Sequence, residues 1–234
     1  MMAWIYAQIT KIRLPRFSLL QWVVHAGSWI PLSLILLDYF RGNLTANPIQ
    51  DITFRTGKAA LVLLVLSLGA TPANTLLGFR AALKVRRALG LYAFMYVTLH
   101  LLIFVGLDYV FDWSLIREAI FDKRYALVGF AAWMILLPLA ITSTKGWMRR
   151  MGKVWKQLHR LVYLAACLAV IHYVWLVKAD TREPWAFGGI VLFLLAVRLP
   201  SIRRWASGLR ARLASQVQLQ IGVRRSWMKL MGRS

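Results

Sequence analysis

Four histidines are the residues of this 234-residue sequence whose type and placement could support chemistry: His25, His100, His159 and His172. They lie in or beside long apolar runs, where an ionisable side chain is costly and therefore marks function. A neutral imidazole there can hydrogen-bond a neighbouring helix, bind a metal ion or ligate haem iron. The positions of the four along their helices separate these alternatives.

His100 and His172 are predicted to lie at one depth. If both runs are helical, His100 is roughly 18 Å beyond Ala88 and His172 roughly 16 Å beyond Leu161, at about 1.5 Å per residue. Two imidazoles facing each other from neighbouring helices are the axial ligand set of a low-spin haem that carries electrons. We therefore favour a bis-histidine haem b over a metal ion, since no carboxylate or cysteine supplements the pair.

The other two histidines have weaker indications. His159 lies about 20 Å along the helix from His172 and, on a straight helix, about 140° around its axis. It could ligate a second, inner haem, border a flavin or quinone site, or be an interfacial histidine beside Arg160. His25 is roughly 12 Å inside the first run, where a helix-to-helix hydrogen bond is favoured over a ligand role.

Six uncharged runs supply the helices that would position these histidines. The chain is 59% hydrophobic, too apolar for a water-soluble domain of this length. A helix needs about 20 apolar residues to cross a bilayer, and only the first four runs qualify directly. The last two are shorter and need snorkelling basic residues at their ends. We predict an all-α integral membrane bundle of six transmembrane helices, whose uncharged cores are 17–37, 59–79, 88–107, 125–144, 161–177 and 184–197.

The charges indicate the orientation of this bundle. Lys and Arg number 30 against 8 Asp and Glu, and 22 of the basic residues lie in the N-terminal arm, the second and fourth connections and the tail. The three remaining connections carry the other basic residues and all the acids. By the positive-inside rule both termini are cytoplasmic. The acids on the opposite side are Asp38, Asp51, Asp108, Asp112, Glu118, Asp122, Asp180 and Glu183.

Three segments follow from this pattern: a cytoplasmic arm (1–16), a transmembrane haem domain (17–200) and a basic cytoplasmic tail (201–234). In the tail, Trp205, Leu209, Leu213 and Val217 have nearly helical spacing. This suits an amphipathic segment on anionic lipid, or equally a disordered basic tail. The sequence shows no internal repeat.

Several classes of function are disfavoured. The positive charges are cut into short clusters, unlike the basic face of a nucleic-acid-binding domain, so lipid rather than nucleic acid is the expected partner. No C-x-x-C-H motif is present, which excludes covalently attached haem. Neither a dinucleotide fingerprint nor a P-loop occurs, so nucleotide chemistry would come from a partner. A transporter or scaffold is less favoured, because neither broken spans in related halves nor intramembrane charges are evident.

Stretches around three of the histidines resemble the MsrQ (YedZ) family, the haem-binding membrane subunit of the periplasmic methionine-sulfoxide reductase system, within the ferric-reductase-like transmembrane superfamily. The resemblance covers roughly residues 17 to 200. The stretches are Arg87-Ala-Leu-Gly-Leu-Tyr92, Thr98-Leu-His100-Leu101, Leu139-Ala-Ile-Thr-Ser-Thr144, Gly152-Lys-Val-Trp-Lys-Gln-Leu-His159-Arg-Leu-Val-Tyr163 and Ile171-His-Tyr-Val-Trp-Leu-Val-Lys178.

The resemblance implies a bacterial inner-membrane protein with one or two b-type haems, and FMN as a further cofactor. It implies electron transfer from the quinone pool or a cytoplasmic flavin reductase to a periplasmic molybdopterin catalytic subunit, in a heterodimer that repairs methionine sulfoxide. The chain itself would hold no catalytic residue. His100, His159 and His172 match the family's histidine positions.

One position departs from the two-haem members of the superfamily. They carry a second histidine about 14 residues before the equivalent of His100, where this chain has Arg86. Arginine cannot ligate iron, so His159 would have His25, or nothing, as its counterpart. A self-sufficient transmembrane ferric or quinone reductase is the alternative function, and the missing nucleotide domain argues against it.

Overall fold

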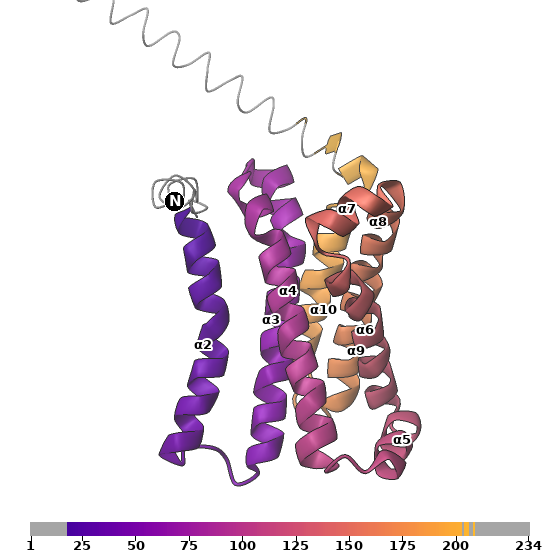
Figure 1. Ribbon diagram of the computed structural model, residues 1–234. Coiled ribbons are helices and arrows are strands. Elements are labelled where there is room, and N and C mark those ends of the chain that lie inside the picture. The colour runs from indigo at the N-terminus through magenta and orange to yellow at the C-terminus, as the bar shows by residue number, and fades with distance from the viewer. Residues whose placement is uncertain (1–17, 203, 206–207, 209–234) are drawn as a thin grey trace, which may run out of the picture.

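All regular structure in the described part of the chain is helical (Figure 1). The computed structural model describes residues 18–202, 204–205 and 208. The predicted arm 1–16 lies outside these residues, as does most of the predicted tail, including Leu209, Leu213 and Val217. The prediction of an all-α protein is confirmed for the described residues.

The helices follow one another through short connections. The long ones alternate in direction, so that successive connections lie at opposite ends of the bundle (Figure 1). They are α2 (Leu19–Arg41), α3 (Pro48–Leu77), α4 (Ala81–Ile103) with a π-helical extension η1 (Phe104–Asp108), α5 (Trp113–Asp122), α6 (Arg124–Ile141), α7 (Lys145–Met151), α8 (Lys153–Leu158), the 3-10 turn η2 (His159–Leu161), α9 (Val162–Leu176) and α10 (Arg182–Ala196).

Five segments among the described residues are long and apolar enough to cross a membrane, and the chain is a multi-pass membrane protein. The sixth predicted span corresponds to α10, which has 15 residues. At about 1.5 Å per residue it is roughly 22 Å long, shorter than the ~30 Å of a hydrocarbon core. The five segments are Leu19–Arg41, Pro48–Leu77, Ala81–Asp108, Arg124–Ile141 and Lys153–Leu176.

Helix α3 begins well before the uncharged run that predicted it. Asn47 caps its first turn by accepting from the backbone N–H of Gln50, and Pro48 occupies the first helical position. The charges in its first turns are paired, because Arg55 contacts Asp51 at 3.0 Å and Asp38 of α2 at 2.5 Å. Paired charges near a membrane interface do not end a helix, so α3 extends well before the uncharged core that starts at residue 59.

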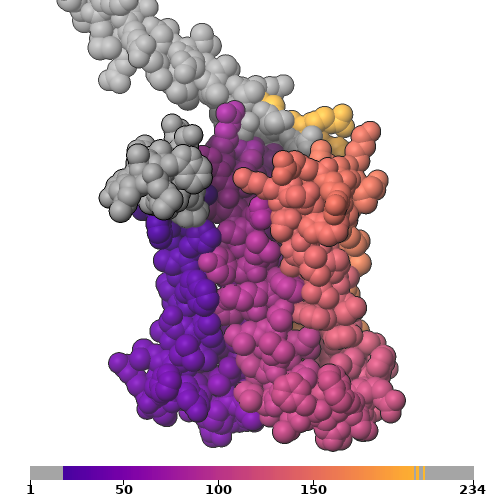
Figure 2. All heavy atoms as spheres, viewed as in Figure 1, coloured from indigo at the N-terminus to yellow at the C-terminus, as the bar shows by residue number. Residues whose placement is uncertain are grey.

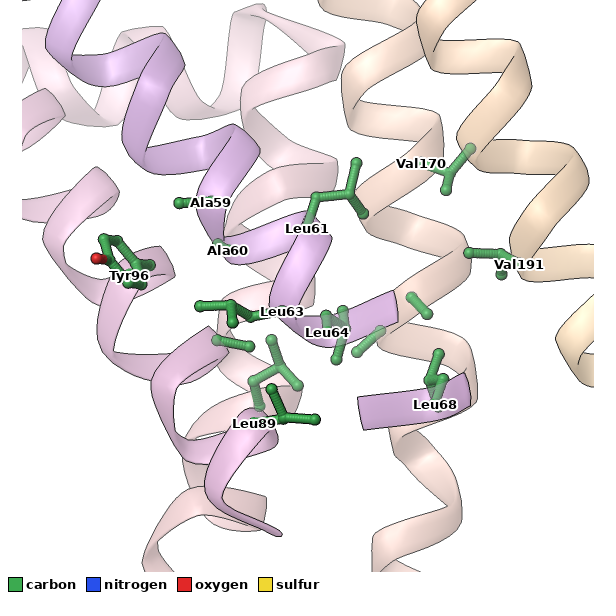
Figure 3. Close-up of a cluster of buried hydrophobic side chains, with 14 of the residues drawn as sticks. Ala59, Ala60, Leu61, Leu63, Leu64, Leu68, Leu89, Tyr96, Val170 and Val191 are labelled. Carbon is green, nitrogen blue, oxygen red and sulfur yellow. The ribbon is translucent and has the colours of Figure 1, made fainter. Parts of the chain in front are cut away.

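The core of the bundle is centred on α3 (Figure 3). Leu61, Leu64 and Leu68 of α3 belong to one buried cluster with residues of α4, α9 and α10. The helices pack mainly as two antiparallel pairs, α3 with α4 and α6 with α9. Helix α10 packs on α9 and α3, whereas α2 lies at the edge of the bundle against α4 (Figure 1). The two pairs are the elements that hold His100 and His172.

Two helix irregularities at prolines are compensated by side chains from other helices. Near Pro31, the buried Tyr96 hydroxyl donates to the carbonyl of Ser28 at 2.7 Å and accepts from the N–H of Leu32 at 3.1 Å. Pro72 has no N–H for the carbonyl of Leu68, four residues earlier. The Arg198 guanidinium donates to that carbonyl at 2.5 Å. These contacts fix α2 on α4 and the end of α10 on α3.

The two ends of the bundle differ in charge. One end, here called the acidic end, comprises the α2–α3 connection with the adjoining turns of α2 and α3, the segment from η1 to the start of α6, and the α9–α10 connection with the first turn of α10. It holds all eight acids of the chain. The other, the basic end, comprises the start of α4 together with α7 and α8. Figures 1 and 2 show α7 and α8 at one extremity and α5 at the opposite one.

Candidate functional site

A cavity of about 500 Å³ lies among α3, α4, α6 and α9. Its deep wall is apolar, with buried residues such as Leu61, Leu64, Ala93 and Leu136. Its lining also includes exposed polar residues of the acidic end, which form the mouth: Asn47, Gln50, Asp108 and Lys123. The cavity is therefore closed toward the basic end and open toward the acidic end.

His100 of α4 and His172 of α9 line this cavity together. Their ring centroids are 6.1 Å apart and the ring planes are nearly perpendicular, at 84°. The structure thus brings together the two histidines that the sequence placed at one depth. Among the described residues, no three His, Cys, Asp or Glu side chains form a group that could hold a metal ion.

Each ring is fixed by a backbone carbonyl of the partner helix in its pair. Nδ1 of His100 donates to the carbonyl of Thr53 at 2.8 Å, and Nδ1 of His172 donates to the carbonyl of Tyr125 at 2.7 Å. A carbonyl only accepts, so Nδ1 carries the proton and Nε2 keeps its lone pair. Such a bond fixes the tautomer and orientation of a metal-ligating histidine.

Each ring also packs against a glycine that the sequence analysis did not single out. An alanine methyl at Gly57 would lie 3.1 Å from Cε1 of His100, and one at Gly129 would lie 2.6 Å from Nδ1 of His172. Each glycine is four residues after the carbonyl that holds the same ring. Neither glycine leaves room for a side chain, so both allow the imidazole to lie directly on the helix backbone.

The two half-sites have the same spacing along the chain. In both, 47 residues separate the histidine from the carbonyl that accepts from it. The sequence Gly-x-Ala-Ala begins 43 residues before each histidine, at Gly57 and at Gly129. The expectation of no internal repeat overlooked this correspondence, which is the sequence signal that would have identified the glycines.

The remaining two histidines do not line the cavity. His25 of α2 is 2.9 Å from the Tyr92 hydroxyl of α4 through Nδ1, a contact between two helices. His159 lies at the basic end in η2, where its ring stacks on Trp155 at 3.9 Å and its Nδ1 is 3.0 Å from the Trp155 carbonyl. Because η2 is a 3-10 turn between α8 and α9, the straight-helix angle of 140° between His159 and His172 does not apply.

The opposed imidazoles are suited to bind a metal-centred planar cofactor from both sides. With a metal–nitrogen bond of about 2.0–2.1 Å and about 1.1 Å from nitrogen to ring centre, two imidazoles on opposite sides of one metal have centroids roughly 6.2–6.4 Å apart. The observed separation is 6.1 Å. The cavity volume is within the usual range for cofactor sites, about 300–1,000 Å³. The residues present therefore fit a haem, which His100 and His172 would hold.

Comparison with known proteins also indicates a haem-binding membrane protein. Residues 56–170 match the family described as ferric reductase like transmembrane component. The chain is 50% identical over 187 residues to the protein-methionine-sulfoxide reductase heme-binding subunit MsrQ of Rhodospirillum rubrum, covering 79% of this chain and 90% of that protein. It is 44% identical over 183 residues to the MsrQ subunit of Xanthomonas axonopodis pv. citri, covering 76% and 84%. No solved structure matches the chain.

Proposed function

This chain belongs to the MsrQ family of haem-binding subunits of protein-methionine-sulfoxide reductase, and we propose that it carries electrons across the bacterial inner membrane to a periplasmic reductase that repairs methionine sulfoxide. The observation that supports this most directly is the opposed pair His100 and His172 in an apolar cavity. A haem bound between two imidazoles exchanges one electron and has no open position for oxygen. The chain is therefore a non-catalytic subunit of an oxidoreductase complex.

The residues around the proposed haem have separate tasks. His100 and His172 would hold the haem iron through Nε2, the ring nitrogen that keeps its lone pair. Thr53 and Tyr125 hold those rings through their carbonyls, and the apolar wall excludes water from the site. We assign haem b to this site, since no covalent attachment motif is present. His159 lies outside the cavity, and we propose that it borders the entry site for electrons at the basic end.

The donor side of the proposal rests on charge. The basic end carries Lys145, Arg149, Arg150, Lys153, Lys156 and Arg160. A basic surface raises the local concentration of anionic partners, which suits FMN or a flavin reductase; the quinone pool, which is uncharged, is the alternative donor. The acceptor would be a molybdopterin catalytic subunit that forms a heterodimer with this chain at the acidic end, where the mouth of the cavity lies.

We predict six spans with both termini in the cytoplasm, α10 being the sixth, with 17–200 as the haem domain. The reason is that 22 of the 30 basic residues lie on the side of the termini. Alkaline phosphatase, which is active only outside the cytoplasm, should be inactive when fused after Arg233 and active when inserted after Asp112. An active fusion after Arg233 would contradict this orientation.

We expect membranes that contain the chain to reduce a purified periplasmic methionine-sulfoxide reductase subunit when a flavin reductase and its nucleotide substrate are supplied on the cytoplasmic side. His172→Ala should lower the rate to that of membranes without the chain, while co-purification with the catalytic subunit persists. His25→Ala is the matched control and should retain most of the rate. Unchanged transfer in His172→Ala would show that electrons bypass the proposed haem.

A further inference from the structure

The mouth of the cavity differs chemically from its interior. Haem b carries two propionate carboxylates, and a carboxylate is costly to bury without a partner. The deep wall is formed by apolar residues such as Leu64 and Leu136, and the indole N–H of Trp133 in the lining is already bonded to the Thr98 hydroxyl, so no cation there can receive one. If the ring lies between His100 and His172, its propionates must therefore face the mouth at the acidic end.

Two lysines line the cavity, and they differ in their partners. Lys58 of α3 forms an ion pair with Glu183 at 2.6 Å, so its charge is already matched. Lys123 takes part in none of the ion pairs found among the described residues. Its Nζ donates to the Tyr109 hydroxyl at 2.9 Å and lies 5.6 Å from the centre of that ring. Of the two lysines, Lys123 is therefore the one whose ammonium group is available to pair with a carboxylate of a ligand.

The surroundings of Lys123 keep it charged and in place. The bond to Tyr109 and the nearby Asp108 raise the pKa of Lys123 above its usual value, so it is protonated at neutral pH. It is the residue before α6, whose N-terminal turn has no side-chain cap and whose dipole favours an anion nearby. Asp108 at the same mouth would repel a carboxylate, so a propionate bound there needs a cation as its partner.

We propose that Lys123, held by the Tyr109 hydroxyl, is the binding subsite for one haem propionate, an inference that rests on the proposed haem at His100 and His172. The ligand chemistry is a carboxylate on the edge of a macrocycle. The subsite fixes the rotation of the ring about the axis between the histidines. It also distinguishes the free acid from its ester, which gives a direct test.

The test uses the full-length chain produced in a haem-deficient host and titrated in detergent with ferric haem or its dimethyl ester, following the Soret band. Lys123→Gln should weaken binding of haem about fivefold, the size expected for an exposed ion pair, and leave binding of the dimethyl ester unchanged. Lys123→Arg should restore most of the affinity for haem. Lys178→Gln, at the same end but outside the cavity lining, should change neither ligand.

The outcomes separate the subsite from the haem site itself. Equal weakening of both ligands by Lys123→Gln would show a structural role, and unchanged binding of haem would show that the lysine does not contact it; either result overturns the subsite alone. If the unsubstituted chain binds neither ligand, the proposed haem site fails and the subsite fails with it.

Discussion

His172→Ala should abolish most of the haem absorbance of the purified protein, and His100→Ala should do the same. In the proposed site the haem would be held without a covalent bond, and each variant removes one of the two histidines that would bind its iron. Losing a group that merely orients a metal ligand costs about 10–100-fold in affinity, so losing a ligand should lower haem occupancy by more than about tenfold. Haem content per protein, from the visible spectrum and a protein assay, measures this directly.

The control for this prediction is His25→Ala. His25 contacts the Tyr92 hydroxyl and does not line the cavity, so this variant should keep nearly all of its haem. Membrane insertion of each variant is checked by immunoblotting of the membrane fraction. A normal bis-histidine spectrum in both His100→Ala and His172→Ala would refute the assignment of the ligands.

Gly129→Ala should be nearly as damaging, although it changes no ligand. The added methyl would lie 2.6 Å from Nδ1 and 2.9 Å from Cε1 of His172, closer than atoms approach without a shift. The ring must move away from α6, which breaks its bond to the carbonyl of Tyr125 and misdirects Nε2. We expect haem affinity to fall by roughly 10–100-fold, as for the loss of other groups that orient a ligand.

The chain offers a graded series for this experiment. At Gly57 the methyl would lie 3.1 Å from the His100 ring, so Gly57→Ala should have a smaller effect. At Gly69, on the same helix as Gly57, a methyl meets nothing within 4 Å, so Gly69→Ala should be neutral. Haem content and thermal stability in detergent should rank the three variants in this order. Full haem content in Gly129→Ala would show that the ring does not depend on its contact with α6.

Much of the helical framework was predictable, because a membrane helix must satisfy its backbone internally and exclude charge from the hydrocarbon. The uncharged runs therefore identified the positions of the long helices. Their ends were less predictable, as α3 shows. A search for uncharged runs ends a span at any charged residue, whether or not that residue is paired. The pairing of Arg55 with Asp38 on another helix exists only in the folded bundle.

The site was predictable only in part, for a similar reason. Rise per residue placed His100 and His172 at one depth, and the structure has their rings 6.1 Å apart. The carbonyls and glycines that hold the rings lie on the other helix of each pair, so depth along one helix does not reveal them. The two Gly-x-Ala-Ala segments indicate the glycines that contact the rings. That signal is the equal distance from each segment to its histidine, and a pattern within a single helix does not contain it. The angle expected for His159 assumed one straight α-helix, and the 3-10 turn η2 between α8 and α9 is not visible in the sequence pattern.

The central claim is that His100 and His172 together hold a haem with both axial positions filled. The most direct test is the spectrum of the purified chain, recorded oxidised, after dithionite reduction and after addition of carbon monoxide, with haem content determined on the same sample. We expect a low-spin spectrum whose Soret band shifts on reduction, at least one haem per chain, and no change with carbon monoxide. A chain without a reducible Soret band, or one whose reduced haem binds carbon monoxide at once, would contradict the claim.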